Sequence, residues 1–243
     1  MGTTGKTSDV RSVWLRPRRE QRGEPPLTRT RIVDAAVALL DEEGIDRLTM
    51  RRLAERLDVV APSLYWHVDT KDDVIDLAVD AIFGEAPPRS RMGRAEEWRA
   101  DVTALLACWR TALLRHPWAA AVPARRRPTI GPHFLAGMEI LQATLTRAGF
   151  TGDGLAAATW ALYNHVMGSA SSQTALHITA EERRLGQEQL QAAADQYPTL
   201  AANGYLYDDD WDGSYSTGLA YLLDGLEAQL KQRPQRPQRP PRP

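Results

Sequence analysis

Three consecutive ring-bearing side chains, Tyr65, Trp66 and His67, stand between Leu64 and Val68. Each of the three can donate a hydrogen bond to a phosphate oxygen, and each ring can pack on a sugar or a thymine methyl group. Leu64 and Val68 are four residues apart, so both can enter a core from one face of a helix. The three rings then remain near the surface, where clustered aromatic side chains need a partner. Contact with nucleic acid is the chemistry that suits them.

The residues around this group add positive charge and allow close approach. Arg51 lies in the first turn of the preceding expected helix, and Lys71 begins the following one. Ala61 and Ser63 are small enough to let the start of the intervening helix approach base edges. The free N–H groups at that helix start can also bind phosphate. The alternative is that the large rings only cover a helix junction; taken as a group, the residues favour a DNA-contacting surface.

Capping residues and helical periodicity predict the elements that position these side chains. Thr28, Thr49 and Thr70 are suitable N-caps, Gly44 is a suitable C-cap, and Pro62 suits a first helical turn. The expected helices are a long one from 28 to Gly44, short ones at about 50–57 and 62–68, and a long one from 70 to about 85. Two short helices with a tight connection are typical of a helix-turn-helix.

The rest of the chain also has helical periodicity, and no strand pattern of useful length is found. Further helices are expected at about 96–116, 132–148, 155–176, 181–194 and 214–230. The predicted fold is all-α, with a helix-turn-helix DNA-binding domain followed by a larger helical domain. The expected boundaries are 1–27 for a basic disordered arm, 28–85 for the helix-turn-helix domain, 95–230 for the helical domain and 231–243 for a disordered Pro/Gln/Arg tail.

Charge and composition narrow the partners and the location. Formal net charge is −1, yet residues 1–31 and 231–243 each carry a net of +5, which leaves −11 for residues 32–230. Two basic ends favour a polyanion partner, although the proline-rich C-terminal tail is better explained as a solvated extension. One cysteine, no secretory signal and no 18-residue apolar run indicate a cytoplasmic protein without a membrane span.

The segment "LTMRRLAERLDVVAPSLYWHVDTKDDVIDLAVDAI" resembles the DNA-binding domain of the tetracycline-repressor family of bacterial regulators. LYWHV with a lysine three residues later is especially similar to the tetracycline repressors themselves. A weaker resemblance to their C-terminal domain extends through "ALLRH", "RPT", "GF" and "GLEAQL". The resemblance implies an all-helical homodimer, a DNA-reading helix and a small-molecule pocket whose occupation releases DNA. A twofold dimer is expected to bind an operator that is an inverted repeat.

Carried over by position, the resemblance implies that Arg51 reads a base. The residues expected to contact DNA are Thr49, Arg51, Ala61, Ser63, Tyr65, Trp66, His67 and Lys71. Ala61 replaces a base-reading glutamine of the tetracycline repressors, and Met50 replaces a threonine. A different operator sequence is therefore expected.

The implied ligand pocket departs further from the tetracycline repressors. Pro123, Leu105 and Ser172 stand where those proteins have a metal-binding histidine, a drug-binding asparagine and a glutamate near the metal. These replacements argue against a magnesium–tetracycline ligand, so no metal and no cofactor are expected. The residues expected to contact a large hydrophobic or aromatic effector are Trp109, Phe134, Met138, Trp160, Asn164 and His165. The alternative is that they are core or dimer residues, and a histidine such as His165 on an apolar helix is more often a satisfied core residue.

Other functions have less support in the sequence. The histidines are scattered, and no zinc-protease, nucleophile-elbow, phosphate-loop or dinucleotide motif occurs, so the protein is predicted not to be an enzyme. An architectural DNA binder held by its basic ends is the second alternative. Residues 208–219 match part of a calcium loop but have Leu219 where a bidentate glutamate is needed, so an acidic solvated loop is expected. The main prediction is a ligand-responsive transcriptional regulator, a repressor released from its operator by a small molecule.

Overall fold

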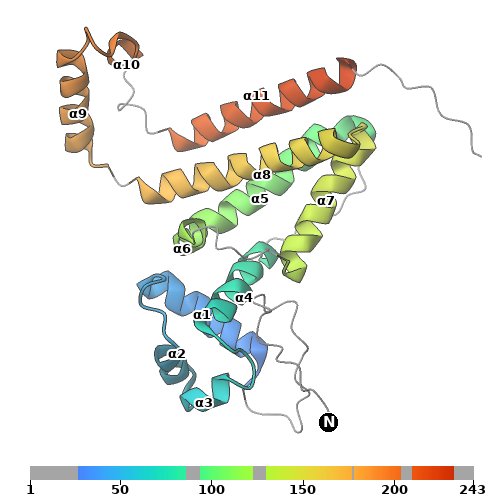
Figure 1. Cartoon of the computed structure of the whole chain (residues 1–243), viewed down its shortest axis with the longest axis vertical. Coiled ribbons are helices and arrows are strands. Elements are labelled where there is room, and N and C mark those ends of the chain that lie inside the picture. The colour runs from blue at the N-terminus through green and yellow to red at the C-terminus, as the bar shows by residue number, and fades with distance from the viewer. Residues whose placement is uncertain (1–26, 86–93, 123–129, 177, 204–209, 233–243) are drawn as a thin grey trace, which may run out of the picture. The chain divides into compact units, whose positions relative to one another are not determined.

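The computed structural model describes residues 27–85, 94–122, 130–176, 178–203 and 210–232. Across these residues the secondary structure is helical and no strand is present, which confirms the all-α prediction (Figure 1). The chain divides into two compact units, residues 1–159 and 160–243. None of the described helices combines the length and hydrophobicity that crossing a bilayer requires.

The first four helices follow the predicted caps closely. They are α1 (Arg29–Glu43), α2 (Met50–Leu57), α3 (Ala61–Leu64) and α4 (Lys71–Gly84). Thr28 Oγ1 accepts the Arg31 N–H at 3.2 Å and Thr49 Oγ1 accepts the Arg52 N–H at 3.2 Å. Thr70 forms a capping box with Asp73 at the start of α4. In α1, α2 and α4, side-chain oxygens thus replace the hydrogen-bond partners that the first N–H groups of a helix lack.

The helix predicted over about 62–68 was placed too far at its C-terminal end, because α3 stops at Leu64. Residues 65–67 form a turn, in which the Val68 N–H still donates to the Leu64 carbonyl at 3.0 Å. The cause lies in the next helix: the N–H groups of Asp69 and Thr70 both donate to Asp73 Oδ2 at 3.0 Å. An N–H committed to the cap of α4 cannot continue the ladder of α3. Leu64 and Val68 are nevertheless both buried, as predicted.

Helix α1 holds the helix-turn-helix unit together. It packs against α2 and α4, and its buried face includes Ile32, Ala36, Leu39 and Leu40. On the surface, Arg56 of α2 makes an ion pair with Glu42 at 2.6 Å. At the start of α4, Lys71 Nζ donates to the Ile45 carbonyl at 2.9 Å. The positions of α2 and α4 are therefore fixed relative to α1 by an apolar core with polar contacts at its edge.

The remaining helices of the first unit follow α4 in the chain. They are a 3-10 turn, η2 (Ala95–Glu97), α5 (Trp98–Arg115), α6 (Pro117–Ala121), α7 (Pro132–Ala148) and the first part of α8 (Gly152–Ala175). Helix α7 begins and ends as predicted, with a left-handed Gly149 at its C-cap. Helix α6, which was not predicted, begins at Pro117, because proline suits a first helical turn. Helix α4 packs against both α5 and α7.

A buried carboxylate joins α4 to the start of α7. Asp80 is 3% exposed, and its Oδ1 accepts the Phe134 N–H at 2.9 Å while Oδ2 accepts the His133 N–H at 3.3 Å. A side chain of one helix thus caps another. The arrangement also presses Asp80 against Gly131, where a Cβ atom would overlap the carboxylate.

The second unit contains most of α8, α9 (Ala180–Ala192), α10 (Pro198–Asn203) and α11 (Trp211–Gln232). Helix α10 was not predicted, and α11 begins earlier than the expected residue 214. Asp210 Oδ1 accepts the Gly213 N–H at 2.8 Å at the start of α11. Residues 211–219 are therefore helical, and the expectation of an acidic loop was wrong for them; Asp208 lies outside the described residues.

Candidate DNA-binding surface and ligand-contact residues

The aromatic residues that follow α3 lie at the surface. The exposed fraction of Trp66 is 72% and that of Tyr65 is 44%, whereas Leu64 beside them is fully buried. Ala61 and Ser63, in α3 itself, are half-buried. Exposing a tryptophan costs hydrophobic free energy that folding alone does not recover. The local fold therefore leaves these two rings at the surface beside the helix-turn-helix.

Arg51 is exposed in the first turn of α2 and makes an ion pair with Glu55 at 2.8 Å. The hydrogen bond from Arg51 to Glu55 raises the pKa of the guanidinium above its usual value, so the group stays charged. An exposed pair of this kind is weak. Arg51 can therefore exchange Glu55 for a base or phosphate at little cost.

Three other predicted contacts already have intramolecular roles. The Thr49 hydroxyl caps α2, and Lys71 Nζ donates to the Ile45 carbonyl. His67 is half-buried, and burial, followed by the positive charge of Arg29, lowers the pKa of its imidazole. Near pH 7 the lowered pKa favours the neutral form of the His67 ring over the cation.

Two of the predicted ligand-contact residues belong to one aromatic cluster in the first unit. The rings of Trp109 and Phe134 are stacked with centroids 6.2 Å apart, and Phe83 meets both edge-on at 5.9 and 5.6 Å. The three side chains come from α5, α7 and α4 and are buried. Met138, one turn along α7 from Phe134, is half-buried. Helices α4, α5 and α7 thus meet around aromatic side chains.

The other three predicted residues lie in the second unit, on α8. Trp160 is 53% exposed and contacts Tyr163 edge-on at 5.5 Å, and Asn164 is also exposed. His165 stacks on Tyr215 at 5.0 Å, and its Nε2 lies 3.0 Å from the Tyr215 carbonyl oxygen. That geometry gives His165 a satisfied hydrogen bond within the protein, as expected of a structural histidine.

The positions that depart from the tetracycline repressors fall in different surroundings. Leu105 is buried in α5, Ser172 is exposed on α8, and Pro123 lies outside the described residues. Within the described ranges no group of three or more His, Cys, Asp or Glu side chains is arranged to hold a metal ion.

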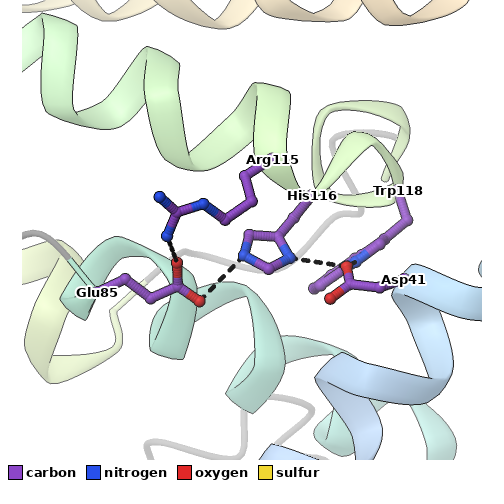
Figure 2. Close-up of polar contacts among 5 residues, drawn as sticks. All are labelled: Asp41, Glu85, Arg115, His116 and Trp118. Carbon is purple, nitrogen blue, oxygen red and sulfur yellow. Dashed lines mark hydrogen bonds and ion pairs between the residues drawn. The ribbon is translucent and has the colours of Figure 1, made fainter.

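Sequence reasoning missed a polar cluster around His116 (Figure 2). The ring Nδ1 lies 2.7 Å from Asp41 Oδ1, and Nε2 lies 3.0 Å from Glu85 Oε1. Trp118 Nε1 donates to the same Asp41 oxygen at 2.6 Å, and Arg115 Nη1 donates to Glu85 Oε2 at 2.9 Å. Asp41 and Glu85 are far from His116 in the chain, so no local pattern indicates that the three meet.

A helix-turn-helix with exposed aromatic residues, followed by a helical body, defines a DNA-binding transcriptional regulator. Comparison with known proteins supports the same class of protein. Residues 32–78 match the model for bacterial regulatory proteins of the tetR family, and residues 93–230 match the model for the tetracyclin repressor-like C-terminal domain. The chain therefore belongs to the tetR family of regulators, and it is a ligand-responsive DNA-binding repressor.

Individual relatives cover nearly the whole chain. An HTH-type transcriptional regulator of Saccharopolyspora erythraea is 44% identical over 89% of this chain and 92% of its own length. The HTH-type transcriptional repressor DrrR1 of Streptomyces coeruleorubidus is 32% identical over 91% and 85%. The structure of ActR from Streptomyces coelicolor in complex with actinorhodin has a TM-score of 0.73, with 30% identity over 85% of this chain and 98% of that one. Members of the family bind DNA operators and small-molecule effectors and form dimers.

Proposed function

We propose that the protein is a homodimer that represses by binding an inverted-repeat operator in the cytoplasm. The operator-contacting residues of each protomer are Thr49, Arg51, Ala61, Ser63, Tyr65, Trp66, His67 and Lys71. The single observation that carries this proposal is the contrast between the fully buried Leu64 and the exposed Trp66, two residues away. Folding has placed one side chain in the core and left the other, larger one in solvent beside a helix-turn-helix.

Within this surface the residues have different tasks. Arg51 is the base reader, because its weak ion pair with Glu55 leaves an exposed, charged guanidinium that can form a bidentate contact. Tyr65, Trp66 and His67 contact the backbone, where a neutral N–H or O–H donor is sufficient. Lys71 holds the Ile45 carbonyl with one N–H and directs another at phosphate.

The effector is a large hydrophobic or aromatic small molecule bound by the helical domain, and its binding releases DNA. The contact residues proposed in the first unit are Trp109, Phe134 and Met138. For Trp160, Asn164 and His165, which belong to the second unit, contact with the effector stays a prediction from the sequence. The ring cluster of Phe83, Trp109 and Phe134 supports this class of ligand, because aromatic walls with few polar groups suit such compounds. The ActR complex with actinorhodin gives further support from a structure similar to this chain.

Selection from a pool of random DNA duplexes, followed by quantitative band-shift titration, tests the proposal. The protein should enrich an inverted repeat, and the Trp66→Ala variant should bind the enriched duplex at least tenfold more weakly. Leu200→Ala, at an exposed residue of α10, is the matched control and should bind as the unaltered protein does. Enrichment of no motif, with similar affinity for every duplex, would instead support an architectural DNA binder.

A further inference from the structure

Val60 immediately precedes α3, the second helix of the helix-turn-helix (Figure 1). Its exposed fraction is 69%, whereas the exposed leucines in the described part of the chain range from 40% to 49%. The neighbouring Val59 is half-buried, and Leu64 at the other end of α3 is fully buried. The apolar surface of Val60 is therefore not used by the core of this unit.

The side chain of Val60 also contributes nothing to the helix that it precedes. Val60 is the N-cap residue of α3 and makes no side-chain cap hydrogen bond, whereas Thr28, Thr49 and Thr70 cap α1, α2 and α4 with side-chain oxygens. An aliphatic residue at an N-cap stabilises a helix less than serine, threonine, aspartate or asparagine does. A side chain that neither caps its helix nor enters the core is available for contact with a partner.

The backbone holds this side chain in a defined place. The Val59 N–H donates to the Ala54 carbonyl at 3.0 Å, and the Ser63 N–H donates to the Val60 carbonyl at 2.9 Å. The backbone of Val60 is extended, with φ −78° and ψ 139°, and a β-branched side chain has few χ1 rotamers. Ordering Val60 against a partner therefore costs little conformational entropy.

The place of Val60 in the fold indicates which part of DNA it meets. In a helix-turn-helix, the N-terminal residues of the second helix contact base edges in the major groove. Valine can neither donate nor accept a side-chain hydrogen bond, so it cannot recognise the polar atoms of a base edge. Thymine is the one base of the four that presents a methyl group in the major groove. An apolar contact at this position therefore selects thymine.

We propose that Val60 is a specificity-determining residue that packs on the 5-methyl group of one thymine in each half-site of the operator. The inference rests on the proposed function, because it requires a specific operator. Arg51 recognises its base through hydrogen bonds, whereas Val60 recognises a second base by apolar contact alone. Burial of one methyl group corresponds to about fourfold in affinity, and the same contact in both half-sites to about fifteenfold.

Replacement of thymine by uracil tests this contact, because uracil lacks only the 5-methyl group. The probe is the inverted repeat enriched from random duplexes, in which each thymine position of the half-sites is changed to deoxyuridine in turn. At one position the change should weaken binding of the unaltered protein by about fifteenfold. Val60→Ser removes both methyl groups and supplies a hydroxyl that can cap α3, so the helix is preserved. This variant should bind the thymine and deoxyuridine duplexes equally at that position.

Leu185→Ser, at an exposed aliphatic residue of α9, is the matched control and should keep the full difference between the two duplexes. Band-shift titration of the three proteins on both duplexes measures the effect. A repeat without thymine in its half-sites would overturn the role of Val60, and so would a deoxyuridine effect that is the same in Val60→Ser and the unaltered protein at every position. Either result leaves a sequence-specific repressor in place, whereas enrichment of no repeat would overturn the proposed function as well.

Discussion

At the scale of single residues, the exposed ion pair of Arg51 with Glu55 allows a test of whether Arg51 recognises a base or only adds affinity for any DNA. Arg51→Ala should weaken operator binding by roughly 1–3 kcal/mol and relax discrimination at one base pair. Glu55→Ala is the control, because it leaves Arg51 charged and unpaired with Glu55 and should not weaken binding. Titration on operator duplexes that carry each base at the contacted position measures both effects. An equal loss on operator and on random DNA would remove Arg51 from the base-reading role.

The half-buried imidazole of His67 predicts a pH effect on stability. Because burial lowers the pKa of His67 in the folded protein, the unfolded chain takes up a proton first as pH falls through about 6.5. The free energy of unfolding should therefore decrease on acidification through that range. His67→Gln should show a smaller decrease between pH 7.5 and pH 5.5 in urea unfolding. A decrease as large as that of the unaltered protein would contradict the assignment.

At the scale of elements, the sequence predicted correctly those helix ends that depend on residues next to them in the chain. Pro132 and Gly149 mark the two ends of α7, and both are readable from neighbouring residues. The end of α3 depends on the cap of the next helix, so periodicity alone placed it too late. Helices α6 and α10 have five and six residues, which is too short for an apolar stripe to repeat.

The predictability of the candidate sites follows the same division. The exposed rings Tyr65 and Trp66 were predictable, because the burial of Leu64 and Val68 determines which side chains are left over. The polar cluster around His116 was not, since its two carboxylates reach it only through the packing of α1 and α4. Asp80 was missed for the same reason: nothing beside it in the sequence indicates that it caps α7.

The close packing of α5 on α7 predicts a specific cost at Gly137. A Cβ atom there would lie 2.7 Å from Cζ2 of the buried Trp109. Gly137→Ala should therefore destabilise the protein by roughly 1–3 kcal/mol through overpacking, although alanine favours a helix more than glycine does by about 1 kcal/mol. Trp109→Phe removes the ring edge in question, so the double variant should lose less than the two single losses combined. Additive losses in urea unfolding would show that this contact does not limit the packing.

At the scale of the whole molecule, α8 and α11 are expected to form the dimer as a four-helix bundle with their copies. Both helices carry large exposed rings, Trp160 at 53% and Tyr221 at 72%. Tyr221→Glu should convert the dimer to a monomer at micromolar concentration, because a charge is costly in an apolar interface. Leu185→Glu, an exposed position of α9, should leave the dimer intact. Sedimentation equilibrium measures the assembly, and a monomeric unaltered protein would refute the interface.

The basic N-terminal arm, which lies outside the described residues, is expected to add affinity without specificity. Residues 32–71 carry eight acidic and five basic side chains, so the reading unit alone repels DNA at long range. Deleting residues 1–24 removes five arginines. The deletion should weaken operator binding at low salt and flatten the log–log salt slope by about two units or more, since each phosphate contact contributes about 0.9. Titration of an operator duplex with the full-length and the truncated protein at several salt concentrations tests this expectation. Identical salt slopes for the two proteins would mean that the arm does not contact DNA.

The carboxylate of Asp80 beneath Gly131 has a consequence for how the sequence can change over generations. No side chain fits at residue 131 while an aspartate occupies residue 80. Loss of the aspartate alone leaves the buried N–H of Phe134 without its acceptor, which costs about 1–3 kcal/mol. A descendant that replaces Gly131 must therefore acquire a new cap for α7, supplied by its own helix or the preceding loop, before α4 can give up Asp80. Substitutions at residues 80 and 131 are therefore expected to be correlated, although nothing beside either residue in the sequence indicates the link.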